Sequence, residues 1–410
     1  MWFYVQHVLI PHQKADATLH GTPRGNLSDL YPRWLGAREL LLHHRDPYSP
    51  ELTREIQIGY YGRALDPSRP EDPTDQQAFA YPVYVVFLFA PTVDLPFPVV
   101  QSGFRWLLIF LAVASVVLWL YILRWRPSNA TTISFVALTL GSFPVLQAIK
   151  LQQLSLLVAG LIAGCVALLA GGGFLLAGVL LALATIKPQL VLLVAAWLLL
   201  WAISGWSQRR NFVWGFVVTL TVLCAVGEYV LPGWLWRFRE AVTAYRQYTG
   251  GAESVLDVLV TRGWGRALAA LALLALALMG WRLRRVSVDS MAFPWMLSLT
   301  LAVTVLVVPK TAPYNQVLLL PGVLLIGRNW ELLWGKDRLT RIIALIAVFL
   351  ISWPWLAAGS LTVASLFLRG EWVQKAWTSP LYTSLAIPIA VVVLVSLGFG
   401  EAGNLKPKVS

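Results

Sequence analysis

Apolar stretches of membrane-spanning length recur through most of this chain, beginning at residue 104. A helix needs about 20 mostly apolar residues to cross the hydrocarbon of a bilayer. The candidate segments number eleven, at 104–124, 131–148, 153–170, 174–186, 189–204, 212–231, 265–281, 292–309, 313–327, 341–360 and 381–400. The fourth, fifth and ninth are short, and half-helices or an interfacial hairpin are the alternative to full spans there. Charged residues make up only 13% of the chain, against about 25% in soluble globular proteins. We therefore expect an all-α, polytopic transmembrane bundle over 104–400, and a soluble enzyme domain is excluded.

The basic residues between these segments predict the orientation of the bundle. Lys and Arg in short connections stay on the cytoplasmic side of a membrane. One alternating set of connections, together with the C-terminal tail, holds thirteen of them: Arg124, Arg126, Arg209, Arg210, Arg282, Arg284, Arg285, Arg328, Lys336, Arg338, Arg341, Lys406 and Lys408. The opposite set holds five: Lys150, Lys187, Lys310, Arg369 and Lys375. We expect 401–410 to be a cytoplasmic tail and 1–99 to lie outside.

An outer position for the N-terminal part requires a preceding helix to carry it across the membrane. Only residues 2–11 are apolar at this end, and ten residues are too few to span. A signal peptide would have a basic region, an apolar core and a small-residue cleavage site, and this pattern is missing from the start of the sequence. We therefore expect residues 1–20 to be the remnant of a first transmembrane helix, which would make the bundle twelve-spanning.

The predicted outer segments hold most of the polar chemistry. Eleven of the twenty acidic residues lie before position 100. We expect 21–103 to be a large outer loop with a helix near 31–44 and an interfacial or re-entrant helix near 79–91. A second outer loop, 232–264, is rich in Trp, Tyr and Arg, as helices resting on lipid headgroups are. Because the spans carry almost no charge, a site at the water interface is favoured over a transport path at the midplane.

Four stretches carry a colinear set of motifs. They read S-D-L-Y-P-R-W-L-G-A-R-E-L-L-L-H-H-R-D-P-Y at 28–48, F-A-Y-P-V-Y-V-V-F-L-F-A-P-T-V-D-L-P at 79–96, L-Q-Q-L-S-L-L with A-G-V-L-L-A-L-A-T-I-K-P within 151–188, and V-P-K-T-A-P-Y-N-Q-V-L-L-L-P at 308–321. In this order they resemble the motifs of glycosyltransferase family 87, whose members have the GT-C fold and use polyprenyl-phosphate sugars. Two departures stand out: the family's Gly-Gln-x-Asn reads L-Q-Q-L at 151–154, and its aromatic-histidine pair near position 315 is missing.

The resemblance implies a hexosyl- or pentosyltransferase of the mannosyl- or arabinofuranosyltransferase kind. Such an enzyme moves a sugar from a polyprenyl-phosphate donor to a hydroxyl of a lipid or glycan acceptor, with inversion and without a metal or other cofactor. The outer face of a bacterial inner membrane is its implied location. Two alternatives stay open: a flippase or other carrier of lipid-linked saccharides, and an O-antigen-type ligase or polymerase with a diphosphate donor. We expect no nucleic-acid partner, because topology accounts for the net charge of +12.

In the resembled family the base that deprotonates the acceptor hydroxyl is the aspartate of the first outer loop, which corresponds to Asp29. The alternative role of Asp29 is to cap the helix that follows it. Lys187 is the main candidate for the donor phosphate, since it ends one short span and precedes Pro188, and its alternative is to snorkel to the interface. Lys310, Arg262 and Arg266 are further candidates for this contact.

The remaining site predictions concern the acceptor, the loop carboxylates and metal binding. Candidate acceptor or substrate contacts are Asp46, Tyr48, Tyr81, Gln152, Gln153, Tyr314 and Asn315. Asp46 has a turn-forming alternative, because it precedes a proline. Solvated loop charge is expected of Asp66, Asp72 and Asp75, which lie among prolines. No metal site is expected, because the histidines and carboxylates lack the spacing of a ligand set.

Overall fold

The computed structural model describes residues 1–19, 28–66, 68, 69, 72, 73, 75–248, 253–309, 312–368, 372, 376 and 378–402. Within these ranges the regular structure is entirely helical. The all-α prediction is therefore confirmed.

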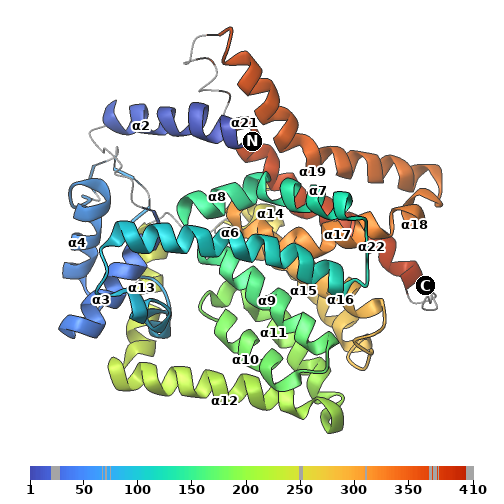
Figure 1. The fold of residues 1–410 in the computed structure, drawn as a ribbon, viewed down its shortest axis with the longest axis horizontal. Coiled ribbons are helices and arrows are strands. Elements are labelled where there is room, and N and C mark those ends of the chain that lie inside the picture. The colour runs from blue at the N-terminus through green and yellow to red at the C-terminus, as the bar shows by residue number, and fades with distance from the viewer. Residues whose placement is uncertain are drawn as a thin grey trace.

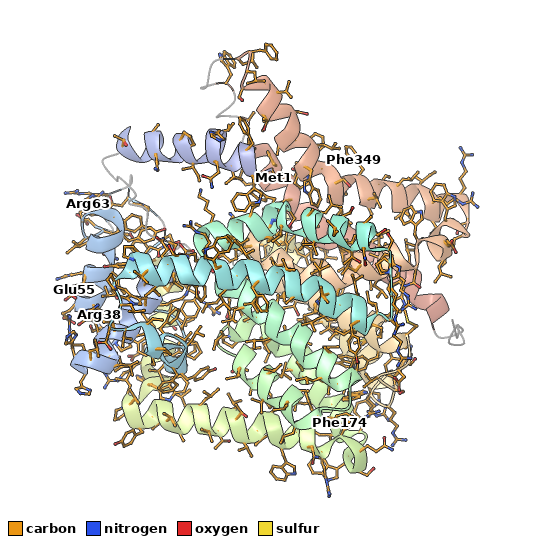
Figure 2. The ribbon with its side chains drawn as sticks, viewed as in Figure 1. Met1, Arg38, Glu55, Arg63, Phe174 and Phe349 are labelled. Atoms are coloured by element: carbon orange, nitrogen blue, oxygen red, sulfur yellow. The ribbon has the colours of Figure 1, made fainter. Side chains whose placement is uncertain are left out.

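Short helices build the region before the bundle. They are α1 (Trp2–Tyr4), η1 (Val5–Leu9), α2 (Ile10–Leu19), α3 (Leu30–His43), α4 (Pro50–Tyr61), η2 (Val83–Val85), α5 (Val86–Phe89) and η3 (Ala90–Thr92). α3 and α4 lie together at one end of the molecule (Figure 1), and the charged side chains of Arg38, Glu55 and Arg63 gather there (Figure 2). The helix expected near 31–44 is therefore present as α3.

The helical run at 83–92 is buried in its first half. Val83, Val85 and Val86 are fully buried, Ala90 and Pro91 are exposed, and the run packs against α3 and α12. The sequence predicts an interfacial or re-entrant helix here, and the structure has a short helical run whose first half packs against protein. An apolar run of this length has the same composition whether lipid or protein covers it, so hydropathy does not separate the two.

The bundle itself follows residue 97. Its helices are α6 (Phe97–Ile122), α7 (Asn129–Leu140), α8 (Phe143–Leu151), α9 (Leu154–Ala170), α10 (Phe174–Ala184), α11 (Pro188–Ile203), α12 (Trp206–Val230), α13 (Trp234–Tyr248), α14 (Val255–Leu259), α15 (Arg262–Arg282), α16 (Ala292–Val307), η4 (Pro313–Leu319), α17 (Leu320–Arg328), α18 (Trp330–Trp334), α19 (Arg338–Ala364), α21 (Thr378–Thr383), η5 (Ser384–Ala386) and α22 (Ile387–Ala402). In Figure 1, α9, α10 and α11 lie between α6 and α12.

Helix length is where the structure departs most from the sequence prediction. In the described ranges, α6, α12, α15 and α19 are long and apolar enough to cross a membrane, and the bent pair α7–α8 makes five if it is one span. Five of the other predicted crossings are shorter apolar helices, and the one predicted at 313–327 is divided between η4 and α17. The 11 residues of α10 rise only about 16 Å, roughly half of a hydrocarbon layer of about 30 Å. Eleven predicted crossings thus become four or five full-length candidates.

α10 and α12 pack in backbone contact. A Cβ added at Gly178 would lie 2.1 Å from the carbonyl oxygen of Phe212, and one added at Gly215 would lie 2.2 Å from that of Leu175. Only glycine permits this approach, because any side chain would force the helices apart. The contact fixes the position of α12, which leads directly into α13 and the cavity described below.

Contacts join several of the connections that the charge pattern assigns to the cytoplasmic side. Arg124, after α6, pairs with Asp289, after α15. Arg209, in the first turns of α12, donates to the carbonyl oxygen of Val286 at 3.1 Å, and Arg328 donates to the main chain at the end of α6. Arg209 and Arg328 therefore also satisfy carbonyl groups at or just after helix C-termini, where a cation is favoured.

Single cysteines are expected to report the orientation of the two ends. In a variant without Cys165 and Cys224, we expect Ser68→Cys and Thr249→Cys to react with an impermeant thiol reagent in intact cells, and Ser287→Cys to react only after permeabilisation. The basic residues hold the Ser287 side in the cytoplasm, and both Ser68 and Ser287 are exposed, whereas residue 249 lies outside the described ranges. Labelling of Ser287→Cys in intact cells, with Ser68→Cys protected, would invert the predicted orientation.

Candidate functional site

A cavity of about 880 Å³ lies where the two predicted outer loops meet the bundle. It is lined by the start of α3, the end of α4, residues of 75–82, the α8–α9 and α10–α11 junctions, α13 and the segment that enters η4. Substrate sites usually enclose about 300–1,000 Å³ and combine apolar walls with a few convergent polar groups. The cavity therefore has the size of a substrate site.

Asp29 occupies the N-cap position of α3, but its side chain makes no capping hydrogen bond. It lines the cavity instead. One carboxylate oxygen accepts a hydrogen bond from Gln153 Nε2, and the other accepts from Tyr60 Oη at 3.4 Å and from Gln77 Nε2 at 3.5 Å. Burial raises the pKa of the Asp29 carboxyl, and the charge of Arg33 opposes part of that rise. A carboxylate with a raised pKa is a stronger base, as removal of a hydroxyl proton requires.

Lys187 lines the same cavity from the α10–α11 junction. It is the N-cap residue of α11, with Pro188 at the first helical position. Its side chain is only 3% exposed. Nζ donates to Ser155 Oγ at 2.7 Å and to the side-chain oxygens of Gln153 and Asn315 at 3.4 Å. A snorkelling lysine keeps its ammonium group in water, so snorkelling does not describe Lys187.

Gln153 connects these two groups. Its Nε2 donates to Asp29 and its Oε1 accepts from Lys187 Nζ at 3.4 Å. One amide side chain therefore sets the spacing between the carboxylate and the ammonium group.

Arg33 is a buried cation that the sequence prediction missed. Its side chain lines the cavity, is 4% exposed, and donates to the Asp29 carbonyl and to Tyr81 Oη. Its guanidinium carbon also lies 4.4 Å from the centre of the Tyr81 ring. Residues four apart share one face of a helix, and Arg33 follows Asp29 by four residues in the S-D-L-Y-P-R-W motif. This spacing could have indicated that Arg33 lies beside Asp29.

Asp75 is also in the cavity, although the sequence predicts a solvated loop charge. Its Oδ1 accepts from Tyr245 Oη at 2.8 Å, and its Oδ2 accepts from Gln77 Nε2 at 3.1 Å. Burial and the charge of Asp75 raise the pKa of Tyr245, so that this hydroxyl stays protonated and donates. The expectation for Asp75 was therefore wrong, because α13, some 170 positions later in the chain, covers it. Asp66 is exposed as expected, whereas Asp72 is buried and paired with Arg63.

The predicted acceptor contacts divide into two groups. Tyr81, Gln153, Tyr314 and Asn315 line the cavity, and Gln152, Tyr48 and Asp46 do not. The members of the second group have structural contacts. Gln152 is buried between Ser28 and the carbonyl of Gln101. Tyr48 Oη donates to the carbonyl of Tyr81 at 2.6 Å. Asp46 accepts from the Tyr48 amide at 2.9 Å, as its turn-forming alternative predicts, and pairs with Arg237.

The other predicted phosphate contacts do not meet in this cavity. Arg262 pairs with Glu253 at 2.7 Å at the start of α15. Arg266 lies one turn further along that helix, near Asp257, and neither arginine lines the cavity. Lys310 lies outside the described residues.

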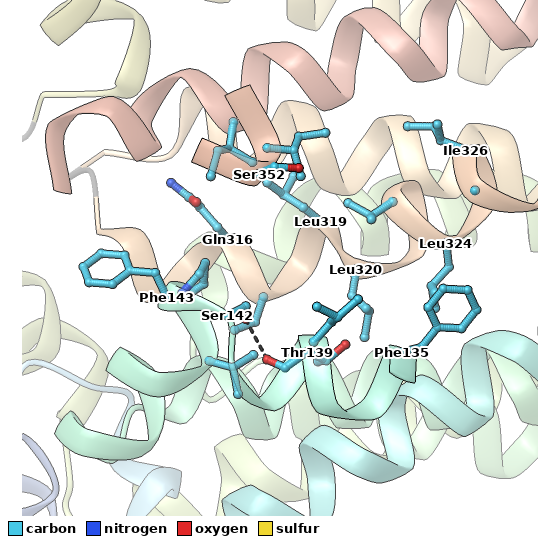
Figure 3. A pocket seen from close by; sticks show the side chains of 18 of the residues that line it. Phe135, Thr139, Ser142, Phe143, Gln316, Leu319, Leu320, Leu324, Ile326 and Ser352 are labelled. Atoms are coloured by element: carbon cyan, nitrogen blue, oxygen red, sulfur yellow. Dashed lines mark hydrogen bonds between the residues drawn. The ribbon is translucent and has the colours of Figure 1, made fainter. Parts of the chain in front are cut away.

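A second cavity, of about 520 Å³ and lined mostly by apolar side chains, shares walls with the first. Figure 3 shows its lining, with Phe143 and Thr139 on one side and Gln316, Leu319 and Leu320 facing them. α8 and η4 contribute to both cavities, through different residues of each helix. The consecutive residues Asn315 and Gln316, for example, line the polar and the apolar cavity respectively. A polar site and an apolar chamber therefore lie on either side of the same short helices.

Comparisons with known proteins give one match. The model of glycosyltransferase family 87 matches residues 79–309, which is more than half of the chain. The match includes Gln153, Lys187 and α13, and it begins after Asp29 and Asp75. No curated protein and no solved structure matches the chain.

Proposed function

The chain belongs to glycosyltransferase family 87, and from this premise we propose that it transfers a sugar from a polyprenyl-phosphate donor to a hydroxyl of a lipid or glycan acceptor. The protein is a membrane-embedded enzyme with several apolar helices. The observation that carries the proposal is the placement of a partly buried carboxylate, Asp29, and a buried ammonium group, Lys187, in one cavity with Gln153 between them.

The cationic side of the site suits the phosphate of such a donor. Lys187 and Arg33 are both nearly inaccessible to solvent and both line the cavity. A cation that acts at a low dielectric stabilises charge more strongly than one in water. We assign these two side chains to the phosphate, which gains negative charge as the sugar leaves it, and the proposal uses no metal ion for this purpose.

The carboxylate side suits an inverting transfer. The acceptor oxygen attacks the anomeric carbon of the sugar on the face opposite the phosphate, and its bond to that carbon forms as the carbon–phosphate oxygen bond breaks. The acceptor proton passes to Asp29, and the electron pair of the broken bond leaves with polyprenyl phosphate. Proton removal by a well-placed base contributes about 10²–10⁴-fold to such a step. Asp29, with a pKa raised by burial, has the chemistry for this role.

The apolar cavity supports a donor that is carried by a lipid. A polyprenyl-phosphate sugar has a long apolar chain next to an anionic group, and the two cavities provide an apolar and a cationic environment on shared helices. Each buried CH₂ group contributes about 0.8 kcal/mol to binding. We propose that the phosphate lies at Lys187 and that the first part of the chain enters the apolar cavity.

The proposed location is the outer face of a bacterial inner membrane. Residues from both predicted outer loops line the polar cavity, as Asp29 and Tyr245 illustrate. The excess of basic residues in the other set of connections favours the cytoplasm for those connections. The site would then face the side opposite the cytoplasm.

Donor turnover by the purified protein in lipid nanodiscs tests the proposal. We expect release of polyprenyl phosphate from mannosyl or arabinofuranosyl donors with a monophosphate link, and weaker turnover of a donor shortened to two isoprene units, because it fills less of the apolar cavity. The measurement is mass spectrometry of the lipid products. Turnover restricted to diphosphate-linked donors would support the ligase or polymerase alternative, and movement of intact donor across the bilayer without cleavage would support a carrier.

A further inference from the structure

The polar cavity contains a second carboxylate at the far end of a hydrogen-bonded chain from Lys187. Lys187 donates to Gln153, Gln153 donates to Asp29, and Gln77 donates to both Asp29 and the second carboxylate, Asp75. Asp29 therefore occupies the middle of the chain. The ammonium group and Asp75 are on different sides of it.

This order of charges divides the cavity between two kinds of ligand. Lys187 and Arg33, the buried cations among the described lining residues, attract a phosphate, and a carboxylate repels it. Arg239 and Arg246 of α13 also line the cavity, but they are exposed to solvent, where salt screens their charge. A neutral molecule rich in hydroxyl groups can donate hydrogen bonds to Asp75, and hydrogen bonds to an ionised acceptor are about twice as strong as neutral ones. The phosphate of the donor therefore belongs on the Lys187 side of Asp29, and a hydroxyl-bearing acceptor belongs on the Asp75 side.

The surroundings of Asp75 have the chemistry of a sugar-binding surface. The Asp75 carboxylate lines the cavity and accepts hydrogen bonds from Tyr245 and Gln77, as a carboxylate can accept several at once. The rings of Tyr60, Tyr61 and Tyr245 line the same cavity. Rings of this kind offer an apolar face and a polar edge, which suits the alternating C–H and O–H groups of a sugar.

Local backbone geometry supports a functional role for this segment. Gln77 has a φ of 51°, in the left-handed region that side chains other than glycine rarely adopt. Gln77 is buried, with 7% of its surface exposed, and its amide group donates to both carboxylates. A strained residue is retained where its surroundings over-determine it, which is frequent at ligand sites. Here the strain places one amide group between Asp29 and Asp75.

We propose that Asp75, with Gln77 and Tyr245, forms a subsite for the terminal sugar of the acceptor and orients one of its hydroxyl groups toward Asp29. The proposal deepens the proposed function and rests on it. In this proposal α13 not only covers the cavity but also takes part in acceptor binding through Tyr245. Asp75 touches the acceptor but takes no proton, so it acts on acceptor binding and orientation.

The test separates acceptor use from donor use. Purified wild type and variants are assayed with a polyprenyl-phosphate sugar and with octyl mannoside or octyl arabinofuranoside as acceptor probes. Asp75→Asn is expected to raise the KM for the probe by about 10-fold or more, the effect of a lost hydrogen bond to a charged group. Tyr245→Phe, which keeps the charge of Asp75, is expected to raise it less. The KM for the donor is expected to stay near wild type in both, and transfer of the sugar to water is expected to fall less than transfer to the probe.

Asp66→Asn is the matched control, because Asp66 lies on the same segment with an exposed side chain outside the cavity. It is expected to leave all the kinetic constants unchanged. An unchanged KM for the probe in Asp75→Asn, or an equal loss of transfer to the probe and to water, would overturn the subsite. So would a wild type that releases polyprenyl phosphate but uses neither octyl glycoside. A wild type that releases no polyprenyl phosphate at all would instead contradict the proposed function.

Discussion

Asp29→Asn is expected to lower the rate of sugar transfer by about 10²–10⁴-fold, the loss that follows removal of a general base. Asparagine keeps the size and shape of the side chain, replaces one acceptor oxygen with an NH₂ group, and cannot take up the acceptor proton. Burial raises the pKa of the Asp29 carboxyl. Wild-type kcat/KM should therefore fall as the pH drops through a value above the usual aspartate pKa of about 3.9, since the base is active only when ionised. This acid limb should be absent from the residual activity of the variant.

Ser49→Ala provides the contrast that separates catalysis from helix capping. Ser49 is a true cap of α4, since its side chain accepts from the Leu52 amide at 3.1 Å, and its loss is expected to cost about 0.5–2 kcal/mol of stability. We expect Ser49→Ala to lower the melting temperature and keep the activity. We expect Asp29→Asn to keep the melting temperature and lose the activity. Near-normal turnover by Asp29→Asn, or its failure to fold, would contradict the assignment of Asp29 as the base.

The predicted site residues that meet in the polar cavity are those for which a motif and a chemical requirement agreed. Asp29, Gln153, Lys187 and Tyr314 come from three of the four stretches, and all four line one cavity. Each motif is weak alone, because apolar runs resemble one another. Their order along the chain is what predicted a common site, although it did not predict how Gln153 would join Asp29 to Lys187.

The residues that the sequence missed depend on contacts between distant segments. The residues around Asp75 have the composition of a solvated loop. Its bond to Tyr245 on α13 is what brings it into the site. Nothing in the local pattern predicts that contact. Arg33 could have been predicted from the sequence more easily, because it lies one helical turn after Asp29 and within the same motif.

The number of full crossings was overestimated for a different physical reason. Hydropathy averages over a window and does not register a break in the backbone. The junction at Ser142 therefore fell inside the predicted segment 131–148, and the junction at Lys187 was visible only as a short gap. In the structure these junctions bend α7 against α8 by 56° and end α10 after 11 residues. The junction at Lys187 lines the polar cavity, and α7 and α8, which meet at Ser142, line the apolar one. The departures from regular spans are therefore where the two cavities form.

Lys187→Gln is expected to impair use of the polyprenyl-phosphate donor by about 10-fold or more, because a charge-assisted contact contributes about 1.5–3 kcal/mol. Glutamine keeps much of the length of the side chain and removes its charge. Lys187→Arg keeps the charge but replaces a compact ammonium group with a planar one, in a pocket already filled by Ser155, Gln153 and Asn315. We expect this variant to retain only part of the activity. The measurement is the donor dependence of polyprenyl phosphate release.

Lys150→Gln is the control for loss of a positive charge at the same end of the bundle. Lys150 lies near the end of α8 and, unlike its neighbour Leu151, does not line the polar cavity, so its loss is expected to leave donor use unchanged. If Lys187→Gln and Lys150→Gln both turned over the donor like wild type, the ammonium group of Lys187 would have no part in binding the phosphate. Arg33 would then be the remaining buried cation of the described cavity, and its guanidinium group would be the one to replace next.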